Sequence, residues 1–276
     1  QNLSHEDTTT PALNFTGNVT LTGPMEFEGV SATFDNGVEA SGNDLTLNFT
    51  QTATLDGFSN VANFTSLGAV DLNGNFNTSG FQKYEGNVSL GGDTELDATT
   101  VEFGAGIEGN GFNLNLAPTS SSDPIVLNNI SLSGVGELTI GGDLDLNGAL
   151  NANEIEIQGN TTLLGNATIS GAKNVSVASG AGFDGPHSLE LLVVDGDLSI
   201  NGDLGATVPL QGLKIYAEGT VELTGNISAT DDIWIQAIGN DYGVIGANKS
   251  GVFLSGDVDS VSGDINITAL GAVANG

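Results

Sequence analysis

The sequence predicts an all-β fold, specifically a right-handed parallel β-helix (β-solenoid) with about 20–23 residues in each coil. Three observations lead to this prediction: the composition, a series of very short alternating apolar pairs, and internal repetition. The 276 residues include 41 Gly and 6 Pro, and 38% are hydrophobic. There are enough apolar residues for a core, but too many helix breakers for long helices.

Apolar residues occur in pairs whose two members are two positions apart, and Gly, Asn or Asp separates one pair from the next. This alternation is typical of strands of about three to five residues that point two side chains inward. Strands so short and so numerous suit a solenoid better than a sandwich, whose longer strands end in hairpin turns. In chain order, the clearest pairs are Val19-Leu21, Leu45-Leu47, Val70-Leu72, Ile130-Leu132, Leu138-Ile140, Leu144-Leu146, Ile155-Ile157, Leu198-Ile200, Val221-Leu223, Ile233-Ile235 and Ile265-Ile267.

Internal repetition gives the length of a coil. Phe34, Phe58, Phe81 and Phe103 are spaced by 24, 23 and 22 residues, and we expect these rings to stack inside. A Gly-Asn motif recurs at residues 17, 86, 165 and 225; its first interval of 69 is three times 23 and its last of 60 is three times 20. A leucine-rich repeat of similar length would show a fixed Leu and Asn scaffold, which is missing here.

The chain divides into a polar N-terminal segment, residues 1–13, and a solenoid over residues 14–276. Ten of the twelve Phe lie before residue 118, so we expect an aromatic interior first and a Leu, Ile and Val interior afterwards. The change occurs near residues 118–124. This stretch is either a boundary between two parts or a loop that leaves one continuous solenoid.

The charge excludes several classes of function. The chain has no Arg, only four Lys, and 34 Asp and Glu, which gives a formal net charge of −30. Such a chain repels phosphate backbones, so we expect no nucleic-acid partner. It has no Cys for disulfides and no apolar stretch long enough for a transmembrane segment. Because it begins at Gln1 without a signal sequence, we expect a mature, processed chain or a fragment.

Several runs resemble the repeats of filamentous haemagglutinin-like exoproteins. They are residues 142–157, 231–237 and 255–269, in which Gly-Asp or Asp-Asp precedes alternating apolar and polar residues. Members of that family are large secreted adhesins built as right-handed parallel β-helices. The resemblance covers mainly residues 128–276. It implies an extracellular or cell-surface location and a surface glycan or protein receptor.

Asp residues beside inward-pointing Leu, Val or Ile are the candidate metal ligands. Their carboxylates should face outward and align between coils, where Ca²⁺ would relieve their repulsion. The alternative is a solvated acidic face, and the Gly-rich repeat of a dedicated calcium β-roll is absent. The candidates are Asp143, Asp145, Asp195, Asp197, Asp203, Asp257, Asp259 and Asp264.

Asn-x-Ser/Thr sequons are dense, although alternating strands favour Asn and Thr two apart for reasons of fold alone. Glycosylation is therefore one interpretation of the pattern and strand geometry is the other. Examples are Asn14, Asn18, Asn48, Asn63, Asn87, Asn129, Asn166, Asn174, Asn226 and Asn266.

Catalytic signals are poor, so we predict no enzymatic activity and no cofactor other than calcium. β-Helical pectate lyases use an Arg or Lys beside their metal, and this chain has no Arg. Asp231 and Asp232 could be paired carboxylates of a glycosidase, but adjacent residues favour a turn. Trp234 alternates with Ile233 and Ile235, which favours packing over the next coil; stacking on a sugar is the alternative.

These observations predict a noncatalytic extracellular β-solenoid that acts as a stalk, adhesin segment or matrix component. One alternative is a self-assembling surface filament, because residues 265–276 carry no charge and an uncapped coil end is a template for strand addition. Head-to-tail association would follow, either with another copy of the chain or with further repeats of a longer parent chain. The other alternative is a carbohydrate-active β-helix.

Overall fold

The computed structural model describes residues 2–3, 13–118, 124–238 and 251–270. Over these residues the chain forms strands and no helix, and every strand pairing is parallel, so the predicted all-β solenoid is confirmed, with about 11 turns. The chain forms two compact units, residues 1–142 and 143–276. The predicted polar segment 1–13 and the subdivision near 118–124 fall largely outside the described residues and stay predictions.

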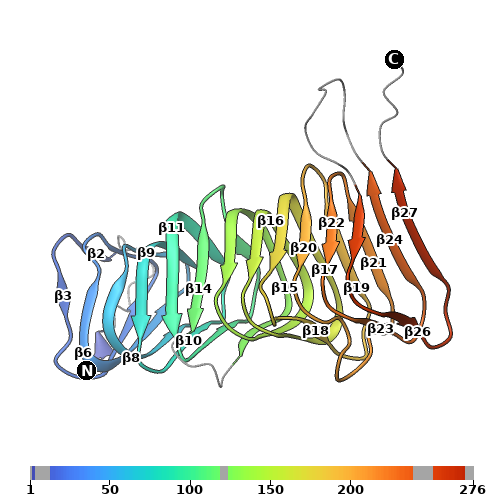
Figure 1. Ribbon diagram of the computed structural model, residues 1–276. Coiled ribbons are helices and arrows are strands. Elements are labelled where there is room, and N and C mark those ends of the chain that lie inside the picture. Colours follow the sequence, from blue (N-terminus) through green and yellow to red (C-terminus); the bar gives the residue numbers. More distant parts are fainter. Residues whose placement is uncertain (1, 4–12, 119–123, 239–250, 271–276) are drawn as a thin grey trace, which may run out of the picture. The chain divides into compact units, whose positions relative to one another are not determined.

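Unit 1 contains the first fifteen strands (Figure 1). They are β1 Asn2–Leu3, β2 Leu13–Phe15, β3 Val19–Thr20, β4 Met25–Gly29, β5 Ala32–Phe34, β6 Val38–Phe49, β7 Ala53–Leu55, β8 Phe58–Ser66, β9 Val70–Thr78, β10 Phe81–Tyr84, β11 Val88–Ala98, β12 Thr100–Phe103, β13 Ile107–Glu108, β14 Leu114–Pro118 and β15 Ile125–Ile140.

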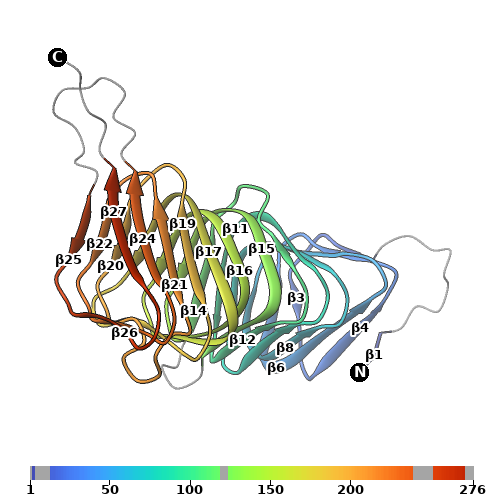
Figure 2. The same cartoon turned by 90° about the vertical axis from the view of Figure 1, so that its right-hand side faces the viewer.

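Unit 2 contains the remaining strands. They are β16 Leu144–Ile157, β17 Thr161–Val177, β18 Phe183–Asp184, β19 Leu189–Val193, β20 Leu198–Ile200, β21 Leu213–Ala217, β22 Val221–Leu223, β23 Ile227–Ala229, β24 Ile233–Ile238, β25 Val252–Leu254, β26 Val258–Ser260 and β27 Ile265–Leu270. Strands β17, β19, β21, β24 and β27 lie side by side on one face of the unit (Figure 2).

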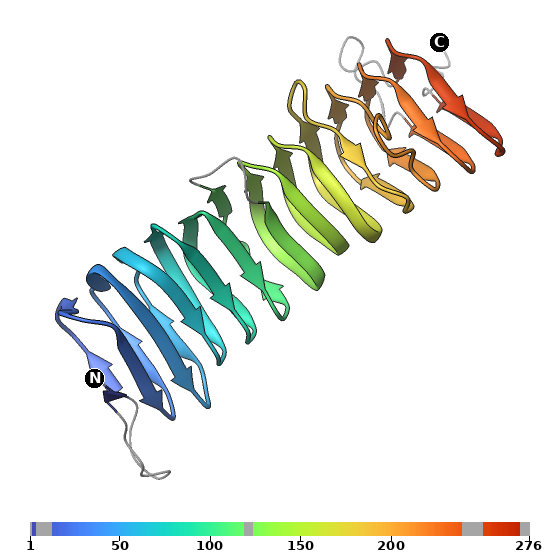
Figure 3. The same ribbon diagram turned by 90° about the horizontal axis from the view of Figure 1, so that it is seen from below.

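Coil length varies more than the sequence predicts. In unit 1, stacked positions at residues 32, 53, 70, 88, 107 and 132 are separated by 21, 17, 18, 19 and 25 residues. In unit 2, positions 144, 161, 183, 204, 227 and 258 are separated by 17, 22, 21, 23 and 31. Short strands pair in continuous register, whereas the long pairs β6–β8, β8–β9, β9–β11 and β16–β17 contain register shifts that take up part of this variation. Within each unit, successive coils follow one another with strands aligned (Figure 3).

The interior changes from aromatic to aliphatic, as predicted. In unit 1, Phe58 lies 4.7 Å from Phe64 and 5.0 Å from Phe76 between ring centroids, and Tyr84 stacks on Phe103 at 5.2 Å. In unit 2 the buried residues are chiefly Leu, Ile, Val and Ala. Burial of these alternating side chains is the main stabilising contribution to such a fold.

The predicted interior position of Phe81 is wrong. Its side chain is 42% exposed, whereas the other three rings of the predicted series are buried. Alternation along β10 turns Gln82 and Tyr84 inward and therefore turns Phe81 outward. Buried Gln82 is satisfied, since its amide donates to the carbonyl of Phe76 at 2.7 Å and its oxygen accepts from the Tyr84 hydroxyl at 2.9 Å.

Candidate functional site

Two of the predicted calcium ligands, Asp143 and Asp145, flank the start of β16. Asp143 is exposed, and its Oδ1 accepts a hydrogen bond from the backbone N–H of Asn160 at 2.8 Å. Asp145 is partly buried, and this burial, together with repulsion from Asp143, raises the pKa of its carboxyl group. The two carboxylates are thus neighbours, but that of Asp143 already accepts a hydrogen bond from the backbone of the next coil.

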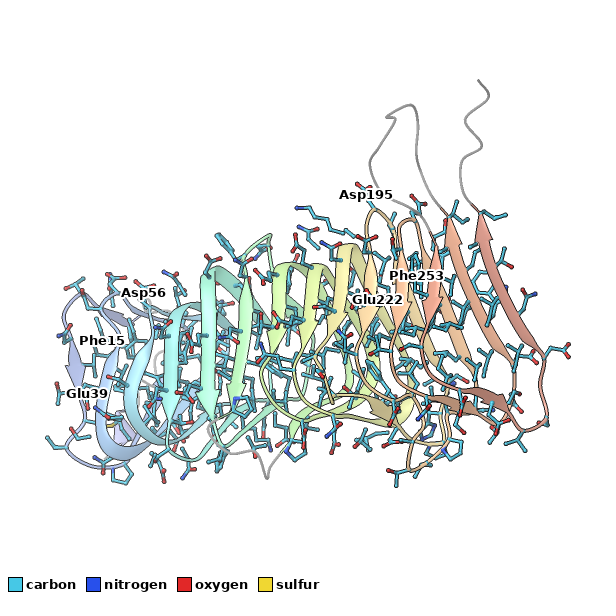
Figure 4. The ribbon with its side chains drawn as sticks, in the orientation of Figure 1. Phe15, Glu39, Asp56, Asp195, Glu222 and Phe253 are labelled. Atoms are coloured by element: carbon cyan, nitrogen blue, oxygen red, sulfur yellow. The ribbon has the colours of Figure 1, made fainter. Side chains whose placement is uncertain are left out.

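The second predicted group lies in two turns on either side of β20. Asp195 is exposed in the turn after β19, where Figure 4 labels it. Asp197 Oδ1 accepts from the N–H of Thr220 at 2.6 Å, and Asp203 Oδ1 accepts from the N–H of Asn226 at 2.7 Å. Asp197 and Asp203 therefore bond to the backbone of the following coil.

The third predicted group surrounds β26. Asp257 donates its N–H to Asn226 Oδ1 at 3.1 Å, and Asp264 donates its N–H to Asp232 Oδ1 at 2.9 Å. Asp259 lies on β26 beside Ser228 of β23. All three of these Asp side chains are exposed.

The predicted alignment of carboxylates between coils is interrupted by an amide at one corner, whereas Asp232 and Asp264 follow one another directly at another. Asp203, Asn226 and Asp257 follow one another at one corner, so an Asn separates the two carboxylates. In the described ranges, no group of three or more His, Cys, Asp or Glu side chains is placed to hold a metal ion. Calcium binding stays a prediction, and these Asp residues have a structural role that the sequence analysis did not identify.

That role is a ladder of side-chain oxygens at the corners, here called the corner ladder. In each rung an Asp or Asn oxygen accepts the backbone N–H of a residue 17–32 positions later. Further rungs, each written as the acceptor followed by the donor, are Asp44–Asn63, Asn63–Phe81, Asp93–Asn113, Asn113–Glu137, Asn166–Ser188, Asn174–Asp197 and Asp184–Thr207. In every rung the acceptor precedes the donor in the sequence.

The corner ladder also explains part of the sequon pattern. Asn63, Asn166, Asn174 and Asn226 belong both to sequons and to the ladder. Their spacing follows the coils because a corner oxygen is needed there. The recurrence of Gly-Asn and Gly-Asp at corners was the sequence signal for this role.

A groove in unit 1 contains two further acidic groups, Glu39 and Asp56 (Figure 4). Glu39 accepts from the hydroxyl of Ser59 at 2.7 Å and from the amide of Asn60 at 3.0 Å, and these bonds lower the pKa of its carboxyl group. Asp56 accepts from the amide of Asn73 at 3.1 Å. Both carboxylates are thus held by neighbouring side chains.

A second groove, here called the Trp234 groove, lies on unit 2 across strands β17, β19, β21 and β24. Its volume is about 530 Å³. Strand pairing aligns Thr168, Glu190, Lys214 and Trp234 on the outer face of successive coils. The other lining residues are Asn166, Ala167, Ser188, Leu189, Gly212, Leu213, Asp231 and Asp232.

Electrostatic contacts organise the Trp234 groove. The Lys214 ammonium forms an ion pair with Glu190 at 2.5 Å and lies 6.0 Å from the centroid of the Trp234 ring. Asp231 and Asp232 are both exposed in the bend before β24, which agrees with the turn favoured by the sequence. Trp234 was identifiable from the sequence, whereas Glu190 and Lys214 were not, because they lie 24 and 20 residues before their partners in the next coil and no constant period reveals the pairing.

No protein-family model, curated protein or solved structure matches this chain in the comparisons. The resemblance to haemagglutinin-like repeats therefore stays a prediction. Within the part of the chain that the structure describes, no helix has the length and apolar character needed to cross a membrane.

Proposed function

We propose that this chain is a noncatalytic structural or adhesive module of an extracellular or cell-surface protein. The observation that carries the proposal is the corner ladder. Acidic and amide groups that would be candidates for catalysis or metal binding instead bond the backbone of the next coil, as Asp143, Asp197 and Asp203 do. Polar side chains used in this way stabilise a repetitive scaffold.

Composition supports the same proposal. A formal net charge of −30 keeps a module soluble and repels nucleic acids and other polyanions. The absence of Arg removes the residue best suited to clamp carboxylates and phosphates. A polar scaffold needs neither affinity for polyanions nor Arg residues that clamp carboxylates and phosphates.

Location is tested by labelling intact cells that carry the gene with an antibody raised against the chain. We expect label on the cell surface or protein in the medium. Protein found only in the cytosol would overturn the extracellular part of the proposal.

Catalysis is tested separately, because a carbohydrate-active β-helix is the alternative. The purified chain is incubated with neutral and acidic polysaccharides while reducing ends and unsaturated products are measured. We expect no product above background. Product that disappears in the Asp231→Asn, Asp232→Asn double variant would establish the alternative, since these are the adjacent carboxylates of the Trp234 groove.

A specific observation favours a second candidate function, a self-assembling filament. Ile265 and Ile267 of β27 pair with Ile233 and Ile235 of β24, which are fully buried, yet they remain 46% and 41% exposed. Leu270 is 49% exposed. Among the described residues β27 pairs with β24 alone, and apolar side chains placed like a core on such a strand are suited to receive another coil. We propose that a second copy of this chain supplies it.

Light scattering over a range of protein concentrations, at moderate salt to screen the net charge, tests this candidate. We expect oligomers that Ile267→Asp abolishes. The matched control is Thr268→Asp, which adds the same charge on the adjacent residue and should leave the oligomers intact. A strictly monomeric wild-type chain at high concentration would refute self-assembly.

A further inference from the structure

We propose that the Trp234 groove binds an uncharged glycan, with one pyranose ring stacked on the indole of Trp234. This inference gives the proposed adhesive role a ligand class, and it rests on that role. It is carried by three observations: an outward-facing Trp on a strand face, a groove of suitable size, and a lining of hydrogen-bonding groups around the ring.

The position of Trp234 follows from strand alternation. Ile233 and Ile235 are fully buried, so the indole between them lies on the outer face of β24, and it is partly exposed. An indole presents a flat apolar surface and an N–H donor, and such groups are typical of sites with one apolar and one polar side. The C–H face of a pyranose ring matches this combination.

The groove has the dimensions of a small-ligand site. Its volume of about 530 Å³ falls within the range of about 300–1,000 Å³ that is usual for ligand pockets. It follows the stacked strands β17, β19, β21 and β24, so a linear oligosaccharide can lie across several coils. The groove lies entirely within unit 2.

The lining supplies partners for sugar hydroxyls. The carboxylate of Asp231 and the second oxygen of Asp232, whose Oδ1 already accepts the N–H of Asp264, can accept hydrogen bonds, whereas Ser188 and Thr168 both donate and accept. Lys214 lies over one face of the indole, 6.0 Å from the ring centroid, and also forms an exposed ion pair with Glu190, so the sugar must stack on the indole surface that Lys214 leaves uncovered. The indole is therefore surrounded by polar groups that can bond to the hydroxyls of a stacked sugar.

Charge selects the class of glycan. Lys214 is neutralised by Glu190, which leaves the carboxylates of Asp231 and Asp232 to dominate the groove. Together with the net charge of −30, they repel uronic acids and sulfated sugars. Cationic sugars would be attracted to acidic groups anywhere on the protein. An uncharged glycan lacks this general attraction, so its binding would depend on the groove itself.

The test uses intrinsic fluorescence, because Trp234 is the only Trp in the sequence. Neutral hexasaccharides of β-1,4-glucose, α-1,4-glucose and β-1,4-N-acetylglucosamine are titrated against the purified chain, with polygalacturonate as the acidic probe. We expect a saturable change in emission with at least one neutral probe and none with polygalacturonate. No change with any neutral probe, or equal binding of polygalacturonate, would overturn the inference.

Variants then locate the site by calorimetry. Trp234→Ala should weaken binding of the active hexasaccharide at least tenfold, and Asp231→Ala provides a second variant at the same groove. The matched control is Phe253→Ala, which removes an aromatic ring 52% exposed on β25, outside the groove, and should leave binding unchanged. Equal binding by all variants would place any glycan site elsewhere.

The failure of this inference is separable from the failure of the proposed function. Absence of glycan binding leaves a surface-exposed, noncatalytic scaffold intact, because cell labelling and the polysaccharide cleavage assay do not involve this groove's affinity. Conversely, a cytosolic location would refute the adhesive role even if Trp234 bound a sugar in solution.

Discussion

At the level of single residues, strand alternation decides whether an aromatic ring packs inside or faces water. Phe64 is fully buried between Phe58 and Tyr84, whereas Phe81 is 42% exposed on β10. Both are Phe residues in the aromatic unit. Their energetic contributions should nevertheless differ widely.

Phe64→Ala should lower the free energy of unfolding by about 3–5 kcal/mol, because it removes a buried ring and leaves a cavity. Phe81→Ala should change it by no more than about 0.5 kcal/mol, the usual range for surface substitutions. Denaturant titration of both variants checks the difference. Equal losses would contradict the orientation of β10.

Asp145 gives a prediction with a pH signature. Burial and repulsion from Asp143 raise the pKa of its carboxyl group, so ionisation destabilises the folded chain above that pKa. Asp145→Asn should therefore stabilise the chain at neutral pH by about 0.5 kcal/mol, a surface-range effect. The gain should vanish as pH falls below the ordinary value of 3.8, where the wild-type carboxyl is protonated in both states.

Glu39 is the control of opposite sign. Bonds from Ser59, Asn60 and the N–H of Ser41 lower the pKa of its carboxyl group, so its ionised form stabilises the folded chain. Glu39→Gln should thus lower the melting temperature at neutral pH, and the difference should shrink as acid protonates the wild type. A higher melting temperature in both Glu39→Gln and Asp145→Asn would indicate that net charge alone governs stability.

At the level of elements, the corner ladder joins the backbone of successive coils through side-chain oxygens. Asn174 Oδ1 accepts the N–H of Asp197 at 3.1 Å. Asn174→Ala should destabilise the chain by about 1 kcal/mol, the net value of a typical hydrogen bond. Asn174→Asp keeps an oxygen acceptor and should restore most of the loss in thermal melts. Equal destabilisation by both changes would mean that the rung contributes nothing.

Strands were predictable from the sequence because apolar residues two positions apart point to the same face of a strand and are therefore buried together. Leu198 and Ile200 of β20 and Ile233 and Ile235 of β24 are buried, as their spacing indicates. Phe81 was misplaced because regular spacing of Phe does not reveal that Gln82 can be buried when its amide is satisfied. Local alternation was the better guide there.

Corners were predictable only in part. The first four Asn-Gly pairs, which begin at residues 36, 73, 110 and 147, are 37 residues apart and have a Gly of positive φ, whereas the next pair, Asn201-Gly202, breaks the interval and its Gly does not have one. This signal for turns was available. The Trp234 groove could not be predicted from the sequence, because coil lengths that vary from 17 to 31 residues conceal which of Glu190, Lys214 and Trp234 become neighbours.

At the level of the whole molecule, charge is the dominant electrostatic property. Thirty excess negative charges repel one another, and salt screens them over about 10 Å at 0.1 M. NaCl should therefore raise the melting temperature measured by circular dichroism. A further increase with CaCl₂ at matched ionic strength would establish specific calcium binding; an equal increase would assign the whole effect to screening. A fall in melting temperature with NaCl would contradict the repulsion argument.

The corner ladder has a consequence for how the chain is made. Because each acceptor oxygen belongs to an earlier coil than the N–H it binds, the ladder N–H groups of a new coil meet acceptors that are already in place, while the side-chain oxygens of the last finished coil can bond to water until then. Folding can thus proceed in one direction as the polypeptide is released, with each turn serving as the template for the next. The same polarity lets such a protein lengthen by duplication of coils at its growing end without redesign of those already formed.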